Sequence, residues 1–440
     1  MASPATDPYY ASTIMLMGGE QRGGTGYSNF VDESGNGFNP TRVGLAGQGA
    51  KVPNSSFAGS MVANNATDYI TNASISFGSN NFSYETWVFP RSPTTGSWSI
   101  MGSAISELGA GSWMLYVAAS TNYLTLYSAS TLIGTTTAMP YNTWTHIAVT
   151  RIGNVFTLYM NGSSIGTATI ARTFTGSTVP LNHSWGSVIN GCVGYYANTR
   201  LVIGSSAYSA NFTAPTTPVT AITNTKWLLN FANGVVVDKS AKNYGLNPVG
   251  TESLSSSVVK YGAGSVYFDG ATSYTVVPTI ATQFNWATLT GGFTIEAWVY
   301  PTTLGGSVRP IVSQSTSTTT NEWEFIWNTS SQLQFRYWTG AARSVIDVGA
   351  TVPINTWTHV AMTFDGSNVR IFVNGVLKVT TAYIAAQVSG LVNLVIGAAG
   401  GGQEGGVIAY YAGYMDDLRI TTVCRYTGNF TPLTYAAPSA

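Results

Sequence analysis

The sequence predicts an all-β fold made of two tandem antiparallel β-sandwich domains of the jelly-roll type. The first observation is a duplication: residues 82–90 read FSYETWVFP and residues 293–301 read FTIEAWVYP, while NTWTH at 142–146 recurs letter for letter at 355–359. The tryptophans of the two blocks are offset by 211 (298 − 87) and 213 (357 − 144) positions. Two blocks matched in order at a nearly constant offset indicate a duplicated domain. Copies of this length can each bury a hydrophobic core.

The second observation is the local pattern of short strands and turns. Residues 369–373 alternate between apolar and other side chains, as expected for a strand with one buried face. Asp365-Gly366 precedes this segment and Asn374-Gly375 follows it, and both pairs favour tight hairpin turns. The first copy repeats the arrangement with residues 155–160 and Asn161-Gly162. No amphipathic helix of 12 residues is evident, so many short strands predict a sandwich.

Further repeats suggest where the two domains begin and end. Val31-Asp32-Glu33-Ser34 matches residues 237–240, and Asn211-Phe212-Thr213 matches residues 429–431. We therefore expect domain one over 1–214, a linker over 215–221 and domain two over 222–440. Two prolines in the Thr-rich linker favour a short, extended connector.

The Glu-x-Trp-Val-x-Pro block is predicted to be a strand. With a period of two, Glu85, Trp87 and Phe89 share one face. We expect Trp87 and its counterpart Trp298 to fill the cores between the sheets. A glutamate on the same face needs a partner if it is buried, and Arg200, which recurs in the second copy, is the candidate.

The charge composition limits the classes of partner. Only 8% of residues are charged and the formal net charge is zero, with no basic run. Nucleic acids and anionic membranes are bound through clustered Lys and Arg, so neither is expected as a partner. No stretch approaches the ~20 apolar residues of a membrane span. Proteins near zero net charge tend to associate, which favours a homo-oligomer.

The N-terminal residues and the cysteines bear on location. The first residues lack the basic and apolar regions of a secretory signal, so we expect no export by that route. Cys192 and Cys424 fall in different copies, so we expect free thiols, with an interdomain bridge as the alternative.

Motifs across nearly the whole chain support a family assignment. In the second copy they are YFDG at 267–270, FTIEAWVYP at 293–301, NTWTHVA at 355–361, FVNG at 372–375 and LVIG at 394–397. These motifs resemble the concanavalin A-like lectin/glucanase superfamily, specifically its laminin-G-like jelly-roll domains. The opening DPYY at 7–10 and the two tails, ANFTAP at 210–215 and NFTP at 429–432, look like bacteriophage versions of the domain.

The resemblance implies a non-enzymatic structural protein exposed on a bacteriophage virion. It would be a head decoration protein, a fibre component or a tail-associated adhesin, made in the host cytoplasm. It would pack against other virion proteins and bind polysaccharide on the host surface. A secreted carbohydrate-binding protein of cellular origin is the alternative binding function.

The second alternative is a glycoside hydrolase. Glucanases similar to this family carry a Glu-x-Asp-x-x-Glu strand, and that spacing is absent here. The nearest arrangement is Glu322-Trp323-Glu324, whose counterpart in the first copy is Ser112-Trp113-Met114. Because the tryptophan repeats and the carboxylates do not, we expect Glu322 and Glu324 on a solvated strand face and predict no catalysis.

Aromatic side chains near the last strand of each copy are the candidate binding residues. Flat rings with neighbouring polar groups can stack on sugars, although the same rings could cover a sheet edge or pack against a subunit. The candidates are Trp185, Tyr195 and Tyr196 in the first copy and Tyr410, Tyr411 and Tyr414 in the second.

No cofactor is expected, with calcium as the one candidate ion. Asp269, Asp416 and Asp417 offer oxygen ligands in the second copy. The first copy has Asn64 and Ala197-Asn198 at the corresponding places, so any calcium site would belong to the second copy alone.

Overall fold

The computed structural model describes most of the chain. The described residues are 9–19, 30–91, 96–103, 111–183, 189–231, 236–240, 242, 244–262, 264–277, 292–315, 321–338, 343–383, 393–399 and 409–432. Apart from one turn of 3-10 helix, η2 (Tyr10–Ser12), all the regular secondary structure in these ranges is β-strand. No helix in this part of the chain is long and apolar enough to cross a membrane. The all-β prediction is confirmed.

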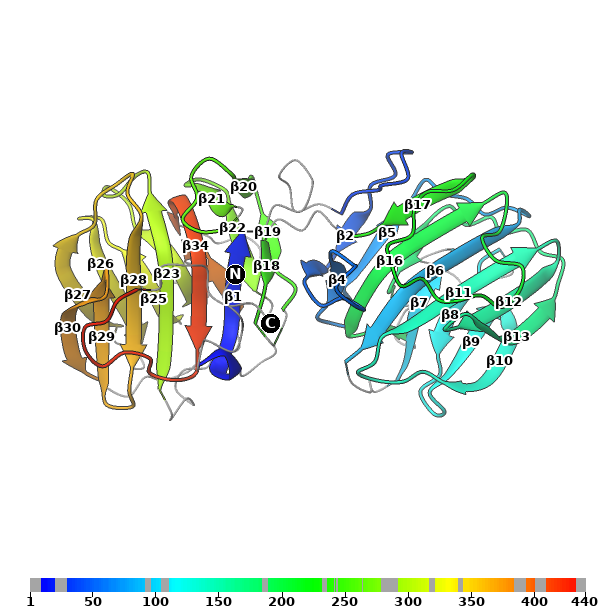
Figure 1. The fold of residues 1–440 in the computed structure, drawn as a ribbon, viewed down its shortest axis with the longest axis horizontal. Coiled ribbons are helices and arrows are strands. Elements are labelled where there is room, and N and C mark those ends of the chain that lie inside the picture. The colour runs from blue at the N-terminus through cyan, green and yellow to red at the C-terminus, as the bar shows by residue number, and fades with distance from the viewer. Residues whose placement is uncertain are drawn as a thin grey trace. The chain divides into compact units, whose positions relative to one another are not determined.

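The chain forms two compact units, which we call the middle unit (29–234) and the terminal unit (1–28 with 235–440). Each unit is a sandwich of two sheets (Figure 1). We call the sheet that contains the Glu-x-Trp-Val-x-Pro strand the front sheet and the other the back sheet. Among the described strands the pairs are antiparallel, apart from the parallel pair of β15 with β7.

The front sheet of the middle unit has the order β13-β12-β11-β6-β16-β4-β3, with β17 also paired to β16, and the back sheet has the order β10-β9-β8-β7-β14-β5-β2, with β15 on β7. The bounds are β2 (Thr41–Val43), β3 (Gly47–Gly49), β4 (Ser60–Ala63), β5 (Tyr69–Asn72), β6 (Phe82–Pro90), β7 (Ser97–Gly102), β8 (Met114–Val117), β9 (Tyr123–Ser128), β10 (Ser130–Ala138), β11 (Thr145–Ile152), β12 (Val155–Met160), β13 (Ser163–Thr169), β14 (Val179–Leu181), β15 (Ile189–Gly191), β16 (Gly194–Ile203) and β17 (Thr225–Leu229).

The terminal unit repeats this plan. Its front sheet has the order β18-β1-β34-β23-β28-β29-β30, with β21 on β34 and β20 on β21, its back sheet has the order β19-β22-β31-β24-β25-β26-β27, and β32 pairs with β33. The bounds are β1 (Thr13–Gly19), β18 (Val236–Asp238), β19 (Asn247–Val249), β20 (Ser253–Ser255), β21 (Ser265–Asp269), β22 (Tyr274–Val277), β23 (Phe293–Pro301), β24 (Arg309–Ser315), β25 (Asn321–Trp327), β26 (Gln332–Trp338), β27 (Arg343–Thr351), β28 (Thr358–Phe364), β29 (Asn368–Val373), β30 (Val376–Ala382), β31 (Leu394–Ile396), β32 (Ala398–Ala399), β33 (Ala409–Tyr410) and β34 (Ala412–Thr421).

The predicted domain boundaries at 214 and 222 are wrong. Strand β17 belongs to the middle unit, where Leu201 of β16 pairs with Trp227. The expected linker lies on the same front sheet, because the carbonyl of Pro215 accepts a hydrogen bond from Trp87 Nε1 (3.2 Å) and the amide of Val219 donates one to the front-sheet residue Asn198. Conversely, β1 lies in the terminal unit between β34 and β18, as the blue strand beside the red one shows (Figure 1).

Each unit has its own apolar core, but the predicted core tryptophans are not in it. Trp87 and Trp298 are half-buried on the outer faces of the front sheets. The inward-facing side of β6 carries Phe82, Tyr84 and Val88 instead. The core tryptophans include Trp113 and Trp323, which are counterparts of each other in the two copies.

Candidate functional site: an aromatic patch on each front sheet

The outer face of β6 places three chemically different side chains in a row. Glu85 lies opposite Arg200 of β16, Trp87 lies opposite His146 of β11, and Phe89 lies opposite Tyr195 of β16. Because side chains alternate along a strand, these residues all point away from the core. The row therefore has a polar end and an aromatic end.

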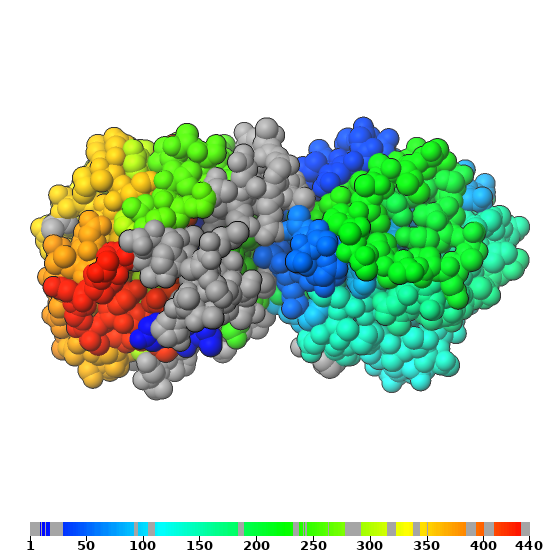
Figure 2. Space-filling model, viewed as in Figure 1, coloured from blue at the N-terminus to red at the C-terminus, as the bar shows by residue number. Residues whose placement is uncertain are grey.

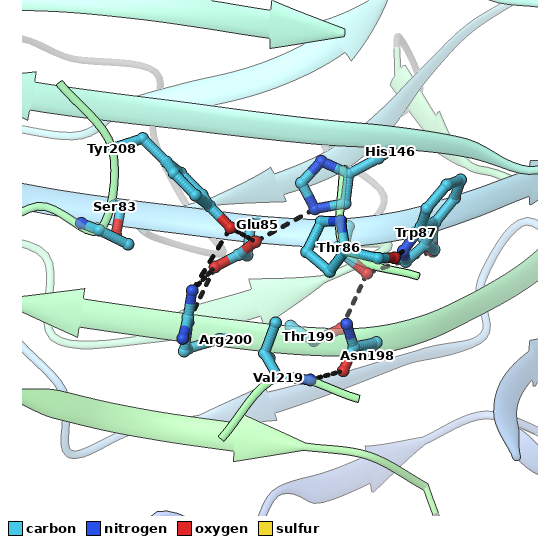
Figure 3. Close-up of polar contacts among 12 residues, drawn as sticks. Ser83, Glu85, Thr86, Trp87, His146, Asn198, Thr199, Arg200, Tyr208 and Val219 are labelled. Atoms are coloured by element: carbon cyan, nitrogen blue, oxygen red, sulfur yellow. Dashed lines mark hydrogen bonds and ion pairs between the residues drawn. The ribbon is translucent and has the colours of Figure 1, made fainter. Parts of the chain in front are cut away.

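The polar end is a buried ion-pair cluster (Figure 3). Glu85 Oε1 accepts a hydrogen bond from Arg200 Nε (2.8 Å) and forms an ion pair with Arg200 Nη2 at 2.6 Å. Its Oε2 lies 3.1 Å from His146 Nε2 and accepts a 2.6 Å hydrogen bond from the hydroxyl of Tyr208. Burial alone would raise the pKa of Glu85, but these three partners hold it below its ordinary value. The predicted partnership of Glu85 with Arg200 is confirmed.

The terminal unit contains the same cluster with one additional cation. Glu296 Oε1 lies 3.7 Å from Arg419 Nε and 3.0 Å from Arg425 Nε, and Oε2 lies 3.4 Å from His359 Nε2. The hydroxyl of Tyr426 donates to Oε2 at 2.9 Å. Burial opposes ionisation, but the histidine and both arginines lower the pKa of Glu296 to about 2. Both glutamates are therefore fixed anions.

The tail that follows the last strand of each copy covers this cluster. In the middle unit Tyr208 stacks on Phe212 with ring centroids 3.5 Å apart, and Phe212 also contacts His146 edge-on at 5.7 Å. Tyr426 and Phe430 stack at the same 3.5 Å in the terminal unit. In Figure 2 the red atoms of that tail lie over the orange strands. The cluster therefore holds the tail on the front sheet, and its buried carboxylate is not accessible to a substrate.

The aromatic end of the row is the part that remains open. In the middle unit the rings of Phe89, Trp144 and Tyr195 lie 5.6–6.4 Å apart. Phe89 and Trp144 are half-buried, whereas Tyr195 is only 2% exposed. Lys51 Nζ lies 4.3 Å from the centroid of the Phe89 ring, and the Arg91 guanidinium lies 4.8 Å from that of Tyr195. We call these five residues the middle patch.

The terminal unit has rings at the three equivalent positions. Tyr300 lies 5.5 Å from Trp357 and 5.7 Å from Tyr414, and Tyr267 extends the group at 5.0 Å from Tyr414. All four rings are half-buried. Burial, followed by the two neighbouring tyrosines, raises the pKa of Tyr414, so its hydroxyl stays neutral. We call these four residues the terminal patch.

The structure separates the predicted binding residues into surface and core. Tyr195 and Tyr414 belong to the patches, and Tyr410 is half-buried near Tyr274. Tyr196 and Tyr411 are fully buried core residues, so these two rings do not reach a ligand at the surface, and Tyr195 of the middle patch is itself only 2% exposed. Tyr196 follows the two-residue period of β16 onto the inner side, whereas Tyr411 lies between β33 and β34. Trp185 lies outside the described residues.

The remaining patch residues were not predicted. The signal was present, because Trp144 and Trp357 stand in the NTWTH repeat, and Phe89 and Tyr300 close the Glu-x-Trp-Val-x-Pro repeat. What the sequence did not indicate is that β6, β11 and β16 are neighbours, which brings the three positions together.

Two of the predicted calcium ligands, Asp269 and Asp416, accept hydrogen bonds from backbone amides. Asp269 accepts hydrogen bonds from the amides of residues 271–273 and from hydroxyls that include that of Thr251, which outweigh burial and hold its pKa well below its ordinary value. Asp416 is buried, and its carboxylate accepts from the amides of residues 260, 261 and 417, although burial raises its pKa to about 6. Asp417 lies at a bulge of β34 and has a positive φ of 47°. Asn198 occupies the equivalent bulge position in β16.

These aspartates are not gathered into one site. No group of three or more His, Cys, Asp or Glu side chains that could hold a metal is found within the described ranges. Calcium in the second repeat stays a prediction.

Glu324 is not on a solvated face. It is 7% exposed and lies 3.7 Å from Arg336 Nη1, on the side of β25 opposite the core residue Trp323. The side chain of Glu322 lies outside the described part. The expectation of an exposed strand face is therefore wrong for Glu324, because strand β26 brings Arg336 alongside it. Cys192 is buried and Cys424 is half-buried, and both are free thiols.

The comparison with protein families agrees with the fold and the duplication. A family model described as the concanavalin A-like lectin/glucanases superfamily, in its laminin-G-like form, matches residues 64–200 and 269–426, one segment in each unit. The matches cover more than half of the chain. The chain belongs to this superfamily. A search of curated protein sequences finds no matching relative.

Solved structures that match part of this chain include receptor-binding domains of bacterial toxins. Botulinum neurotoxin type C, from a study of its interaction with two ganglioside molecules, is 13% identical with a TM-score of 0.35, and the match covers 44% of this chain and 46% of that one. The binding domain of Paraclostridial Mosquitocidal Protein 1 is 14% identical with a TM-score of 0.36, covering 43% and 47%. This chain therefore spans less than half of each of these structures.

Proposed function

We propose that this protein is a non-enzymatic binding protein of a bacteriophage particle and that its two aromatic patches contact carbohydrate. The observation that carries the proposal is the repetition of a ring group at the same three front-sheet positions in both units, in which Phe89 and Trp144 of the middle unit and Tyr300, Trp357 and Tyr414 of the terminal unit are half-buried. Flat rings that keep one side accessible stack on the C–H faces of sugars, and this contact needs little charge. A protein with 8% charged residues is suited to such binding.

The two patches would select different sugars. The middle patch carries Lys51 and Arg91 on its rings, and such cations pair with carboxylates. The terminal patch is built from Tyr267, Tyr300 and Tyr414 around a tryptophan. Their hydroxyls can hydrogen-bond neutral sugars. We propose that the middle unit binds acidic glycans and the terminal unit neutral ones.

The absence of catalysis is supported by the state of the front-sheet carboxylates. Glycoside hydrolysis needs two carboxyl groups that reach the scissile bond. Glu85 and Glu296 are instead buried, bound to arginine and histidine, and covered by the tails. Glu324 lies close to Arg336.

Carbohydrate binding by the two patches is tested with the full chain and two substitutions. Trp144→Ala removes one ring from the middle patch, and Trp357→Ala removes one ring from the terminal patch. The control is Ile152→Ala, because Ile152 is 41% exposed and belongs to neither patch. Calorimetry against acidic and neutral bacterial surface polysaccharides measures affinity, and thermal unfolding checks the fold. We expect each tryptophan variant to bind its class about tenfold more weakly, a loss of about 1.4 kcal/mol. Unchanged binding by both tryptophan variants would contradict the proposal.

The location on a virion rests on the phage-like opening and tails of the sequence. There the protein would pack against other virion proteins as a head decoration, fibre or tail-associated component. Mass spectrometry of purified particles from the host culture tests this location. Absence of the protein from intact particles, with its presence in the host or the medium, would contradict it.

A further inference from the structure

The first strand of each repeat lies in the unit that the other repeat builds. Strand β1 precedes the first repeat, yet it pairs with β34 and β18 of the terminal unit. Strand β17 opens the second repeat, yet it pairs with β16 of the middle unit. The two strands occupy equivalent slots: β1 pairs with residues 418–421 of β34, and β17 with residues 199–202 of β16. The repeats have exchanged their opening strands.

A repeated motif holds each exchanged strand. The buried Asp238 accepts a hydrogen bond from the amide of Leu16 through Oδ1 (3.0 Å), and the amide of Lys239 donates to the carbonyl of Leu16 (2.8 Å). Asp32 and Glu33 make the same pair of contacts with Leu228, at 3.0 and 2.8 Å. The Val-Asp-x-Ser motif at 31–34 and 237–240 is therefore a latch that binds both backbone groups of one strand residue.

The exchanged strands are parts of the cores. Met15 and Met17 of β1 are fully buried in the core of the terminal unit, and Trp227 and Leu229 of β17 are fully buried in that of the middle unit. A slot without its strand would expose apolar side chains and leave a row of backbone groups on β34 unpaired. Each slot therefore requires a strand.

The position beside β34 that β1 fills makes the same contacts with β1 of its own chain as with β1 of a second copy, because the two strands are identical in sequence. After β1 the chain passes through the whole middle unit before it returns to the terminal unit at residue 235. Latch and ladder contacts engage the backbone, and exchange of identical elements between protomers is a low-cost route to assembly. With a net charge of zero, copies do not repel one another.

We infer that β1 is a donor strand and that the slot between β34 and β18 is where two copies of this chain join, with β1 of one copy completing the terminal unit of another. Every chain supplies one β1 and one such slot, so pairing can close reciprocally in a dimer or continue head to tail. This inference is independent of the carbohydrate proposal.

The test traps the strand in its slot with a disulfide. Thr13 of β1 and Thr421 of β34 are register partners, and directly paired strand residues are within the range that a disulfide can bridge. In a full-length background with Cys192→Ala and Cys424→Ser, one tagged chain carries Thr13→Cys and a differently tagged chain carries Thr421→Cys. The two are co-expressed, purified and oxidised. A partner with Ile152→Cys, exposed and in the other unit, replaces Thr421→Cys as the control for random collision.

The expected result is a reducible species that contains both tags, formed several-fold more than with the control. A chain with both Thr13→Cys and Thr421→Cys reports pairing within one molecule. If that chain is trapped as a monomer and mixed-tag dimers stay at the control level, joining between copies is overturned. If neither arrangement crosslinks while circular dichroism shows native folding, the placement of β1 is itself overturned.

A second measurement keeps the inference testable if the cysteine background does not fold. Leu16→Pro, in the otherwise unchanged chain, removes the amide that Asp238 binds. Light scattering after chromatography should show oligomers of the unchanged chain and a several-fold smaller oligomer fraction for Leu16→Pro. An unchanged chain that is wholly monomeric at high concentration would overturn the inference.

Discussion

The carbonyl oxygen of Phe212 lies 1.9 Å from where a Cβ atom on Gly162 would stand. Gly162 has a positive φ of 81°, and its own carbonyl accepts a hydrogen bond from the Phe212 amide (2.9 Å). Asn211 adds a side-chain contact to the amide of Ser164. The hairpin between β12 and β13 is therefore the anchor for the tail, and the terminal unit repeats it, with the same 1.9 Å, between Gly375 and Phe430.

We predict that Gly162→Ala displaces the tail from the front sheet. The matched control is Gly153→Ala, because Gly153 also has a positive φ (59°) but has nothing within 4 Å of the Cβ position. The control should lose about 1 kcal/mol from backbone strain alone. Gly162→Ala should lose at least about 2 kcal/mol more, as the Tyr208 and Phe212 contacts break. Urea unfolding measures both, and equal losses would contradict the anchor.

The ion-pair cluster should make the terminal unit sensitive to acid. The pKa of Glu296 is about 2 in the fold against an ordinary 4.5, so its stabilisation is present above pH 4.5 and is lost as the pH falls toward 2. That difference corresponds to about 3 kcal/mol. Glu296→Gln should be less stable at pH 7, since two arginines lose their counter-ion, and should show a flatter loss of stability below pH 4.5. Chemical unfolding at a series of pH values measures both effects, and identical slopes would contradict the assignment.

The sequence was sufficient for the strand content, the duplication and the pairing of Glu85 with Arg200, because these follow from local periodicity and from repeated residues. It was not sufficient to orient β6. Its inner side packs on the core through Phe82, Tyr84 and Val88, and its outer side carries the large rings of Trp87 and Phe89 beside Glu85. Because both sides carry large aromatic side chains, alternation alone does not tell which side faces the core. The strand exchange was not predicted either, because β1 and β17 occupy equivalent positions in the two repeats and their residues do not indicate which unit each strand joins.

The corrected orientation of β6 predicts unequal contributions to stability from Trp87 and Trp113. Trp113 is fully buried and stacks on Phe82 at 5.3 Å, whereas Trp87 is half-buried beside Phe57. Trp113→Ala should lower the free energy of unfolding by about 3–5 kcal/mol because it leaves a cavity in the core. Trp87→Ala should lower it by clearly less. Denaturant unfolding of the two variants measures the difference, and a larger loss for Trp87→Ala would restore the original sequence interpretation.

Glu252 should limit the stability of the terminal unit at alkaline pH. It is 2% exposed, and burial raises its pKa to about 8 even though Thr275 donates a hydrogen bond to it. A carboxyl group whose pKa is raised in the fold stabilises fully below its unfolded value of about 4.5, and this contribution is lost as the pH rises to about 8. Glu252→Gln keeps the shape and the acceptor for Thr275 without the proton, so the variant should gain stability relative to the unchanged chain as the pH rises through this range. Thermal unfolding at pH 5, 7 and 9 (values chosen to span roughly that range) measures the gain. A stability difference between the two chains that does not vary with pH would show that Glu252 does not titrate as its burial requires.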